Sequence, residues 1–443
     1  MASTYLAKTY SGSGNRQRQT ISFWMKRYKT GAGQVVFSSY YTSSYYAYVL
    51  LKSDDTLQYY NHSNVSIRTN RRLRDVNSWY HICITLDTTQ ATEADRVKIY
   101  INGVQETSLN TATYPAQNAE VKFGDNNLHE IGRHDGGSYF DGALSHFHFV
   151  TNTAYQASSF GLTDATTGEW SINTAPSVTY NTNSFFILKD GNSVTDQSGQ
   201  GNNYSVGGGT LSDLEDCPSN VFNTMSNLNK SSSVDVRRNA NTTVGISNSS
   251  SGAARSNWNI PATGKWYFEY KMIPDNQGNT YPNSGIKYDA EKFYNPDHSN
   301  SDADIFVYGT YGSILLYVRN GTNITANAPA SSGDIFGFAI DQDNGAIYVH
   351  ENGTYMTQGG NVGNPTSGGS KTGAVFTYTA GTYPNMCLVG KEFGNSETQW
   401  NFGNGIFFTT PVSSAGNNPS NVGIFEYDCP TGYTALSTKG LNL

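Results

Sequence analysis

Two pairs of alternating apolar segments constrain this chain more than any other feature of its sequence. Residues 77–87 read Asn-Ser-Trp-Tyr-His-Ile-Cys-Ile-Thr-Leu-Asp, and after a polar turn residues 97–103 read Val-Lys-Ile-Tyr-Ile-Asn-Gly. Alternation with a period of two predicts β-strands, and Asn-Gly predicts a tight hairpin turn. The same order returns in residues 333–341, which end in Asp, and in residues 346–353, which carry Ile-Tyr and end in Asn-Gly. This repeated pattern predicts two copies of one kind of antiparallel β-sandwich.

Length and composition agree with two β-rich domains. A chain of 443 residues exceeds what one hydrophobic core supports. Charged residues make up 14%, whereas 45 glycines and 31 tyrosines favour turns and strands over long helices. We therefore predict an all-β fold of two tandem antiparallel β-sandwich jelly rolls, over residues 1–190 and 221–443. Residues 191–220 are rich in Gly, Asn and Asp, and are expected to form an extended linker.

Charge and hydropathy argue against two classes of partner. A net charge of −7 argues against nucleic acid, which binds to a basic face. The basic cluster at residues 68–74 is interpreted as the solvated end of a strand. No apolar run reaches the roughly 18 residues of a membrane-spanning helix, so no membrane partner is expected. The first residues lack the apolar stretch of a secretory signal, and synthesis in a cytoplasm is expected.

The four cysteines are far apart in the sequence and lack metal-ligand spacing. Cys83 and Cys387 lie within apolar strand patterns and are predicted to be buried thiols. Reduced thiols fit synthesis in a reducing compartment, although a Cys217–Cys429 bridge stays open as an alternative.

Tyrosines gathered among Ser and Thr are candidates for a binding surface. Aromatic rings contact the apolar faces of sugars, while amide and hydroxyl groups bind the sugar hydroxyls. The same side chains suit protein contacts, because rigid amphipathic rings lose little entropy on binding. We predict a glycan- or partner-binding surface, and leave open whether it contacts a sugar or a neighbouring subunit. The candidate residues are Tyr40, Tyr41, Tyr45 and Tyr46 in the first domain and Tyr308 and Tyr311 in the second.

The first half of the chain resembles the laminin-G/concanavalin A-like lectin superfamily. In that superfamily a strand with the pattern Trp-x-His neighbours a hairpin with the pattern Tyr-x-Asn-Gly, which here are residues 79–81 and 100–103. The segments that carry the resemblance are residues 22–27, 78–82, 99–103, 131–133 and 140–149.

The second half resembles the SPRY domain, a related sandwich, in residues 264–270, 333–341 and 351–353. The order of the whole chain is similar to that of structural proteins of tailed phages, especially marine ones. That order includes residues 196–204 and 218–230 between the rolls and a closing segment at residues 429–442. The resemblance implies a virion protein on an exposed appendage or on the shell of the particle.

The lectin resemblance also makes calcium a candidate ion, because laminin-G-like domains often hold one through Asp side chains and loop carbonyls. Asp125, Asp135 and Asp141 fall in loops that could converge at one rim of the first roll. Ordinary Asx turns are the alternative at each position. No cofactor is expected to be required.

Catalysis is not expected. Glucanases with a lectin-like sandwich carry Glu-x-Asp-x-x-Glu on one strand, a pattern that this sequence lacks. Residues 213–216 read Asp-Leu-Glu-Asp, but they lie in the glycine-rich connection and are interpreted as a solvated loop. Gly-x-Ser-x-Gly, His-Glu-x-x-His and a phosphate-binding glycine loop are also missing.

The sequence and its resemblances together predict a non-enzymatic phage virion protein, assembled in the host cytoplasm. The preferred role is a surface-exposed tail fibre or adhesin-like subunit that binds host or environmental glycans, repeated in the particle so that weak sites act together. Its expected partners are other virion proteins and host-surface polysaccharide, and a homo-oligomer in the particle is expected. A capsid decoration or structural linking protein without sugar binding is the first alternative, and a polysaccharide-degrading enzyme is the second.

Overall fold

The computed structural model describes residues 4–62, 65–189, 193–238, 242–246, 251–274, 284–288, 305–310, 313–318, 322–325 and 331–443. The chain forms two compact units, Met1–Asp213 with Cys217–Ser219, and Leu214–Asp216 with Asn220–Leu443. In the described residues, helix is confined to short 3-10 turns, namely η1 (Glu93–Asp95), η2 (Ala157–Ser159), η4 (Pro365–Ser370) and η5 (Gly440–Asn442). No helix in this part of the chain is long and apolar enough to cross a membrane. The predicted all-β fold is confirmed.

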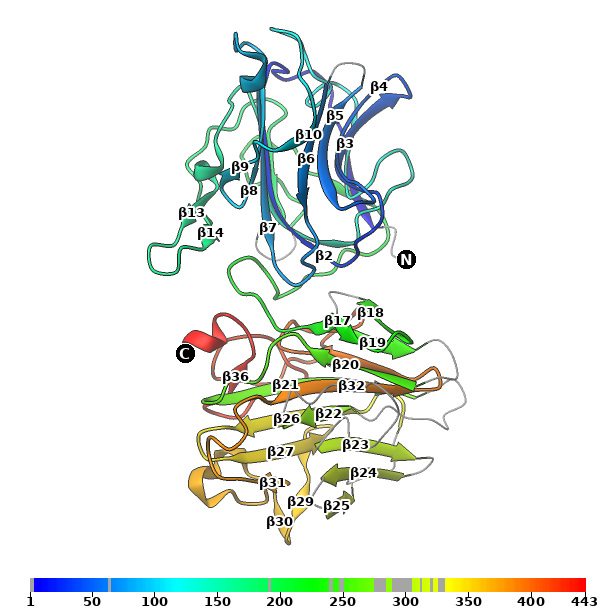
Figure 1. Ribbon diagram of the computed structural model, residues 1–443, viewed down its shortest axis with the longest axis vertical. Coiled ribbons are helices and arrows are strands. Elements are labelled where there is room, and N and C mark those ends of the chain that lie inside the picture. The colour runs from blue at the N-terminus through cyan, green and yellow to red at the C-terminus, as the bar shows by residue number, and fades with distance from the viewer. Residues whose placement is uncertain are drawn as a thin grey trace. The chain divides into compact units, whose positions relative to one another are not determined.

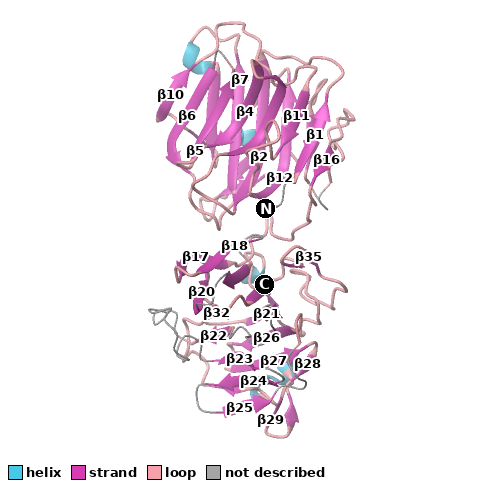
Figure 2. Cartoon of the chain, turned by 90° about the vertical axis from the view of Figure 1, so that its right-hand side faces the viewer, coloured by secondary structure: helices cyan, strands magenta, loops and turns pink. Residues whose placement is uncertain are grey.

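The first unit is a sandwich of two antiparallel sheets. The larger sheet has eight strands in the described residues, and Figure 2 looks onto it. In sheet order these are β10 (Leu109–Thr113), β6 (Val65–Arg72), β5 (Thr56–Asn61), β4 (Tyr45–Leu51), β3 (Gln34–Thr42), β11 (Leu128–Ile131), β1 (Tyr5–Thr9) and β16 (Ser205–Gly208).

The second sheet of this unit has six strands in the described residues. In sheet order these are β15 (Phe185–Ile187), β12 (Gly142–Thr151), β2 (Arg18–Arg27), β7 (Tyr80–Asp87), β8 (Val97–Ile101) and β9 (Val104–Gln105). Figure 1 shows β7, β8 and β9 on one side of the unit and β3, β4 and β5 on the other. The aromatic core lies between the sheets, where Phe37 of β3 meets Phe147 of β12 with ring centroids 5.4 Å apart.

The outer face of the six-stranded sheet is covered by the chain itself. Cys83 and Tyr100 on that face pack with Ala157 and Phe160, which belong to or follow η2. A small hairpin, β13 (Gly161–Thr163) and β14 (Trp170–Ile172), extends this cover. Trp170 donates its indole N–H to Nδ1 of the buried His81 at 3.0 Å. The outer face of the eight-stranded sheet carries polar and aromatic side chains.

The two repeated hairpins have the same local structure. Asn102 and Gly103 after β8 have φ angles of 49° and 78°, and Asn352 and Gly353 have φ angles of 48° and 83°. Positive φ at both central residues matches the twist of a tight antiparallel hairpin. In each copy the Asn side chain accepts a hydrogen bond from a backbone N–H of the first strand of the repeated pair. The donor is His81 of β7 at 2.8 Å in the first copy and Ile335 of β26 at 2.9 Å in the second. The predicted Asn-Gly turns are confirmed.

The second unit is also built from antiparallel sheets. One has seven strands in the described residues. In sheet order these are β17 (Met225–Lys230), β20 (Ser251–Ser256), β32 (Cys387–Phe393), β22 (Gly285–Lys287), β23 (Ile305–Thr310), β24 (Ser313–Val318) and β25 (Thr322–Thr325). Its apolar face contributes Met225, Ile286 and Leu388 to the core of the unit.

The other large sheet of the second unit supplies most of its aromatic core. The main path, within the described residues, is β18 (Val234–Arg238), β19 (Thr243–Ile246), β33 (Glu397–Asn401), β21 (Lys265–Ile273), β26 (Ile335–Asp341), β27 (Ala346–Glu351) and β28 (Thr354–Tyr355). Two short strands pair beside this path: β31 (Phe376–Thr377) with β27, and β36 (Thr434–Ala435) in parallel with β21. Two small hairpins are formed separately by β29 (Thr357–Gln358) with β30 (Asn361–Val362), and by β34 (Ile406–Phe407) with β35 (Thr410–Pro411). Phe268 and Phe338 stack with centroids 5.3 Å apart, and Trp400 packs beside them.

Part of the segment expected as a linker lies within the first unit. β16 pairs with β1 at the edge of the eight-stranded sheet. Tyr204, immediately before it, is buried with its ring centroid 4.7 Å from that of Phe185. None of the four cysteines forms a disulfide, so the Cys217–Cys429 bridge is not present, and Cys83 and Cys387 are buried as predicted.

Candidate functional site

Strand alternation places a group of tyrosines on the solvent-facing side of the eight-stranded sheet. Along β4, Ala47, Val49 and Leu51 point into the core, so Tyr46 and Tyr48 point away from it. The register aligns further residues with them on neighbouring strands, because residues directly opposite in a sheet share a face. Tyr40 of β3 is opposite Tyr46, and Tyr60 of β5 is opposite Tyr48.

The rings form one contiguous cluster. The centroids of Tyr48 and Tyr60 are 4.9 Å apart with planes at 19°, and those of Tyr46 and Tyr48 are 5.9 Å apart with planes at 23°. Rings this close and this nearly parallel overlap in part, as offset-stacked aromatic pairs do. His62, just beyond β5, lies 4.8 Å from Tyr46. We call Tyr40, Tyr46, Tyr48, Tyr60, His62 and His134 the aromatic platform.

His134 joins the platform from the turn that follows β11. Its ring centroid lies 5.5 Å from Tyr40, 5.3 Å from Tyr46 and 5.5 Å from Tyr48. The turn is closed by paired backbone hydrogen bonds between His134 and Gly137. Burial lowers the pKa of His134, against the charges of Asp135 and Glu130 that raise it. The imidazole is therefore neutral at neutral pH, and its Nδ1 is buried without a partner among the described residues.

The phenols of Tyr46 and Tyr48 stay protonated over the physiological pH range. Burial raises the pKa of Tyr48 to about 12, with smaller contributions from Tyr46 and Tyr60. Burial and the neighbouring Tyr60 also raise the pKa of Tyr46. Each hydroxyl can therefore donate one hydrogen bond and accept others. Tyr46 and Tyr48 therefore contribute rings and uncharged hydroxyl groups to the platform.

The predicted tyrosines separate into two groups. Tyr40 and Tyr46 belong to the platform, whereas Tyr41 and Tyr45 lie at the end of the β3–β4 hairpin, with ring centroids 6.3 Å apart. Tyr41 is 70% exposed, while the Tyr45 hydroxyl donates to Asp125. In the second unit, the backbone of Tyr308 pairs with Leu315. The side chain of Tyr308 and all of Tyr311 lie outside the described residues.

Sequence reasoning missed Tyr48, Tyr60, His62 and His134. A signal for three of them was present, because Tyr46 and Tyr48 are spaced by two in an alternating strand pattern, and Tyr60 and His62 have the same spacing. Nothing local marks His134, which reaches the platform only through the pairing of β11 with β3.

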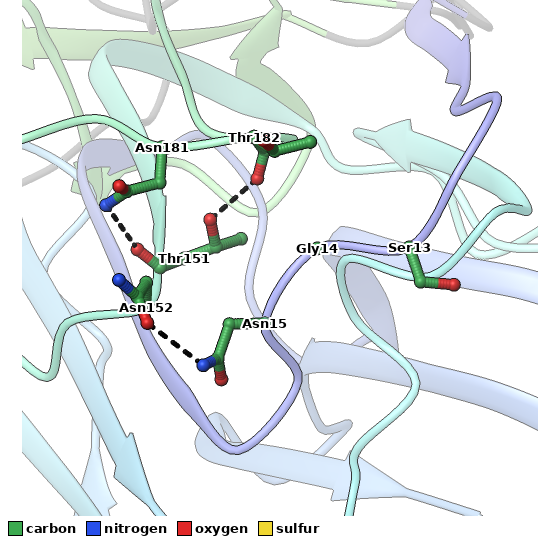
Figure 3. Close-up of a pocket in the computed structure, with 7 residues that line it drawn as sticks. All are labelled: Ser13, Gly14, Asn15, Thr151, Asn152, Asn181 and Thr182. Atoms are coloured by element: carbon green, nitrogen blue, oxygen red, sulfur yellow. Dashed lines mark hydrogen bonds between the residues drawn. The ribbon is translucent and has the colours of Figure 1, made fainter.

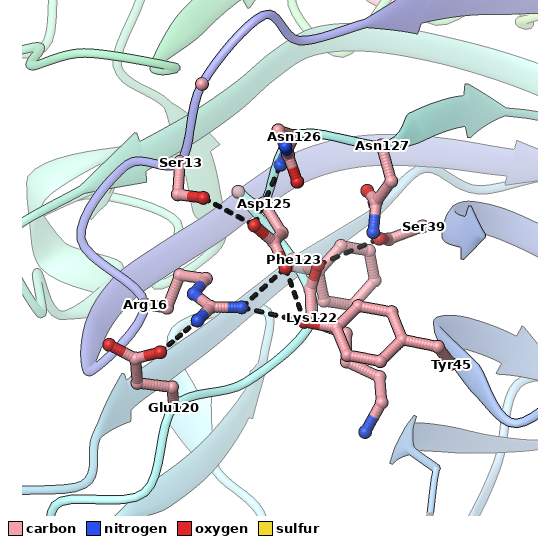
Figure 4. A network of polar contacts seen from close by, with 12 residues as sticks. Ser13, Arg16, Ser39, Tyr45, Glu120, Lys122, Phe123, Asp125, Asn126 and Asn127 are labelled. Atoms are coloured by element: carbon pink, nitrogen blue, oxygen red, sulfur yellow. Dashed lines mark hydrogen bonds and ion pairs between the residues drawn. The ribbon is translucent and has the colours of Figure 1, made fainter.

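Asp125 is the centre of a separate polar network (Figure 4). Its carboxylate accepts hydrogen bonds from Ser13 Oγ at 2.5 Å and from the Asn126 backbone N–H at 2.9 Å. It also forms an ion pair with Arg16 at 2.5 Å, and Arg16 pairs with Glu120 as well. Burial raises the pKa of Asp125, but these hydrogen bonds and the Arg16 charge together hold it below its usual range.

The three predicted calcium ligands have different surroundings. Asp125 is paired with a cation, and Asp135 follows His134 in the turn with a φ of 44°. The backbone carbonyl of Asp141 accepts a hydrogen bond from the Tyr28 N–H at 3.0 Å. Among the described residues, no group of three or more His, Cys, Asp or Glu side chains is arranged to hold a metal ion. Calcium binding at these aspartates is untested, and the contacts of Asp125 with Arg16, Ser13 and Tyr45 compete with it.

A small polar pocket of about 280 Å³ lies in the first unit (Figure 3). Asn15 Nδ2 donates to Asn152 Oδ1 at 3.0 Å, and Thr151 Oγ1 donates to the Thr182 carbonyl at 2.7 Å. Its lining residues are Ser13, Gly14, Asn15, Thr151, Asn152, Asn181 and Thr182. Because many of these polar groups satisfy one another, we place the candidate site at the aromatic platform instead.

Comparison with known proteins supports the fold of the first unit. Residues 2–158 match the family model of the concanavalin A-like lectin/glucanases superfamily. The platform residues Tyr40 to His134 all lie within this match. No curated protein matches the chain.

Several solved structures show some similarity to the chain. Mouse laminin α1 domains LG4-5 have a TM-score of 0.28 at 9% identity, over 96% of this chain and 92% of that one. The SPRY domain of human HERC1 has a TM-score of 0.27 at 13% identity, over 40% of this chain and 96% of that one. A putative carbohydrate binding protein from Bacteroides ovatus has a TM-score of 0.31 at 15% identity, over 47% of this chain and 57% of that one.

Proposed function

We propose that the first unit binds glycans through the aromatic platform. The observation that carries this proposal is the gathering of six aromatic side chains on the solvent-facing side of one sheet, outside the core. The outer face of the partner sheet is covered by the chain's own residues, whereas these rings remain partly exposed. A contiguous apolar surface of this kind is typical of a binding site.

The chemistry of the platform suits a sugar. Exposed ring surface contacts the apolar face of a pyranose, and the protonated phenols exchange hydrogen bonds with its hydroxyls. Ser66, opposite Tyr60 in the same row of the sheet, adds a partly exposed hydroxyl group. Ser38, opposite Tyr48, is buried and donates its hydroxyl to the Arg133 carbonyl at 2.8 Å. The match of residues 2–158 to a lectin and glucanase superfamily supports the same proposal.

Glycan-array binding with the full chain tests the proposal. We expect binding by the wild-type chain and a loss of about tenfold in affinity for Tyr48→Ala, since truncating an aromatic anchor at a binding surface costs roughly 1–2 kcal/mol. Tyr41→Ala is the matched control, because Tyr41 is exposed but lies outside the platform. Absence of binding to any neutral or acidic glycan would refute the proposal.

The finer part of the proposal is that the chain is a tail fibre or adhesin-like subunit of a tailed phage. The sequence resemblance to phage structural proteins supports it. Repetition in a particle would also compensate for the modest affinity of a single shallow site. Immunogold labelling of phage particles that carry this protein would show gold at the tail. Labelling over the head would favour a decoration protein, and unlabelled particles would contradict a virion role.

A specific feature favours the alternative of a protein contact without sugar. The Tyr46, Tyr48 and Tyr60 rings stack on one another, which hides part of the ring surface that a sugar would use. In that case Tyr48→Ala would alter self-association in sedimentation and leave glycan binding undetected. We further propose that the chain cleaves no glycan, so incubation with polysaccharides should release no reducing ends.

A further inference from the structure

The row of residues that crosses the platform continues to a buried carboxylate. Opposite Tyr48 is Ser38 of β3, and opposite Ser38 is Glu130 of β11. Glu130 therefore shares the face of the platform and lies two strands from Tyr48. Its side chain is buried, Oε1 accepts a hydrogen bond from Arg133 Nε at 2.9 Å, and Oε2 has no partner in the described part of the chain. The carboxylate and the guanidinium form an ion pair beside the rings.

Because Glu130 balances its charge, Arg133 has no uncompensated positive charge with which to attract a ligand. The guanidinium also lies over the ring of Tyr5, with its central carbon 3.4 Å from the ring centroid. Burial lowers the pKa of Arg133, but hydrogen bonds from its guanidinium to Glu130 and Tyr139 and the charge of Glu130 leave it raised overall. Its positive charge is therefore permanent and is balanced by Glu130.

The other cations that border the platform are engaged as well. Arg68 of β6 stands opposite Gln58 of β5. It forms an ion pair with Asp54 and donates a hydrogen bond to Thr56 Oγ1 at 2.9 Å. Lys122 Nζ donates to the backbone carbonyl of His62 at 2.8 Å. Burial and the nearby Arg16 lower the pKa of Lys122.

Two further cations, Lys52 just after β4 and Arg72 of β6, lie farther from the rings. Arg72 is exposed and stands opposite Thr56, four residues along β5 from Tyr60. The rings themselves thus border compensated charges, and two carboxylates, those of Glu130 and Asp135, lie close enough to His134 to affect its pKa.

A ligand carboxylate on the platform would lose hydration and gain no unpaired cation in return. Burying part of an uncompensated charge is costly, and nearby carboxylates add repulsion. Neutral sugar hydroxyls avoid that cost, because they only exchange hydrogen bonds with water for hydrogen bonds with phenols. Specificity can arise from such a penalty against the wrong ligand.

We propose that the aromatic platform selects neutral glycans over acidic ones, and that Glu130 sets this preference by neutralising Arg133. This inference rests on the proposed glycan-binding function. It adds the class of ligand and a specificity-determining residue that does not itself have to touch the sugar.

The first experiment compares binding of the full chain to neutral polysaccharides (dextran, mannan, galactan and xylan) and to carboxylated ones (polygalacturonate, alginate and hyaluronate). We expect at least one neutral polysaccharide to bind about tenfold or more tightly than every carboxylated one. Equal or tighter binding of a carboxylated polysaccharide would overturn the selectivity while leaving glycan binding intact. Binding of none of the seven would overturn both.

The second experiment changes the charge and keeps the shape. Glu130→Gln retains an acceptor for Arg133 but removes its counter-charge. We expect binding to polygalacturonate to rise at least about fivefold at low salt and the gain to shrink near 0.15 M salt, where charges are screened beyond about 8 Å. Binding to the preferred neutral polysaccharide should stay within about twofold, since neutral sugars feel no net charge.

Two further variants keep this test decisive. Glu93→Gln in η1 removes one negative charge at an exposed position between β7 and β8, away from the platform sheet, and should leave both affinities unchanged. Asp54→Asn frees Arg68 at a partly exposed position and serves if Glu130→Gln does not fold. No gain for polygalacturonate in a folded Glu130→Gln or Asp54→Asn variant would contradict the role assigned to charge balance.

Discussion

Tyr48 of β4 and Tyr60 of β5 stand directly opposite each other, with ring centroids 4.9 Å apart and planes 19° apart. This pair is the centre of the aromatic platform, because Tyr46 packs against both rings. Loss of either ring removes one side of the stack and leaves the other ring without the partner that holds it in place.

Tyr60→Ala is therefore expected to weaken glycan binding by about tenfold, as Tyr48→Ala does, and the double variant should lose little more. Residues that act through one shared stack are not additive. Biolayer interferometry on immobilised polysaccharide measures the three affinities. Fully additive losses would show that the two rings bind independently.

Asp125→Asn is expected to lower the free energy of unfolding of the first unit by about 1–3 kcal/mol at pH 7, because the ion pair with Arg16 and the hydrogen bond from Tyr45 involve a charged acceptor. The pKa of Asp125 is lowered in the folded state. The stabilisation is therefore present above the ordinary Asp pKa near 3.9 and is lost as the pH falls through the folded value.

Urea-dependent hydrogen exchange of peptides from β3 and β11 resolves this unit from the other. Asp95→Asn is the control, because Asp95 pairs with Lys98 at a partly exposed surface position and such pairs contribute at most about 1 kcal/mol. Equal effects of the two substitutions would show that the Asp125 network adds nothing beyond a surface pair.

Calcium is expected to leave the melting temperature unchanged. A Ca²⁺ ion bound through Asp125 would have to displace Arg16 and the hydroxyls of Ser13 and Tyr45. Differential scanning fluorimetry with about 2 mM calcium, above the roughly 10⁻³ M dissociation constants of weak extracellular sites, checks this. A melting temperature that rises with calcium concentration would restore the calcium site.

Glu392→Gln is expected to stabilise the second unit at pH 8 but not at pH 4. Burial raises the pKa of Glu392 to about 8, against hydrogen bonds from Thr398 and Ser396 that lower it. The folded state therefore holds a proton that the unfolded state releases near pH 4.5. The resulting stability is complete at low pH and is lost as the pH rises from about 4.5 to about 8.

Glutamine mimics the protonated acid, since the Ser396 hydroxyl can rotate to accept from the new amide. Hydrogen exchange of β32 peptides across this pH range, corrected for intrinsic rates, gives the difference between variant and wild type. We expect at least about 1 kcal/mol at pH 8, as one pKa unit corresponds to about 1.4 kcal/mol. A difference that does not change with pH would rule out this titration.

Trp170→Phe is expected to cost about 1 kcal/mol, because it removes the donor to Nδ1 of His81 and leaves that buried nitrogen unpaired. Burial lowers the pKa of His81 to about 3. In the unfolded state His81 binds a proton near pH 6.5, whereas in the folded state it stays neutral until about pH 3. The free energy of unfolding therefore falls as the pH decreases from about 6.5 toward 3. Exchange of β7 amides at pH 7 and pH 5 measures both effects, and equal stability at the two pH values would contradict the second.

The local elements of this protein follow from short-range patterns. The Asn102–Gly103 and Asn352–Gly353 turns need only residues that tolerate positive φ, and alternation along β4 assigns Ala47, Val49 and Leu51 to one face and the tyrosines to the other. Such properties depend on backbone geometry within a few residues. For that reason the all-β class and several strands could be predicted from the residues alone.

The candidate site depends on contacts between distant parts of the chain. His134 meets Tyr48 across 86 positions (134 − 48), and Glu130 reaches the row of Tyr48 only because β11 pairs with β3. Tyr204 and β16 likewise join the first unit from a segment whose composition suggested a linker. Strand order is set by the packing and loop closure of the whole domain, which no local pattern encodes. Composition pointed to tyrosines, but the sheet determines which of them meet and which charges stand beside them.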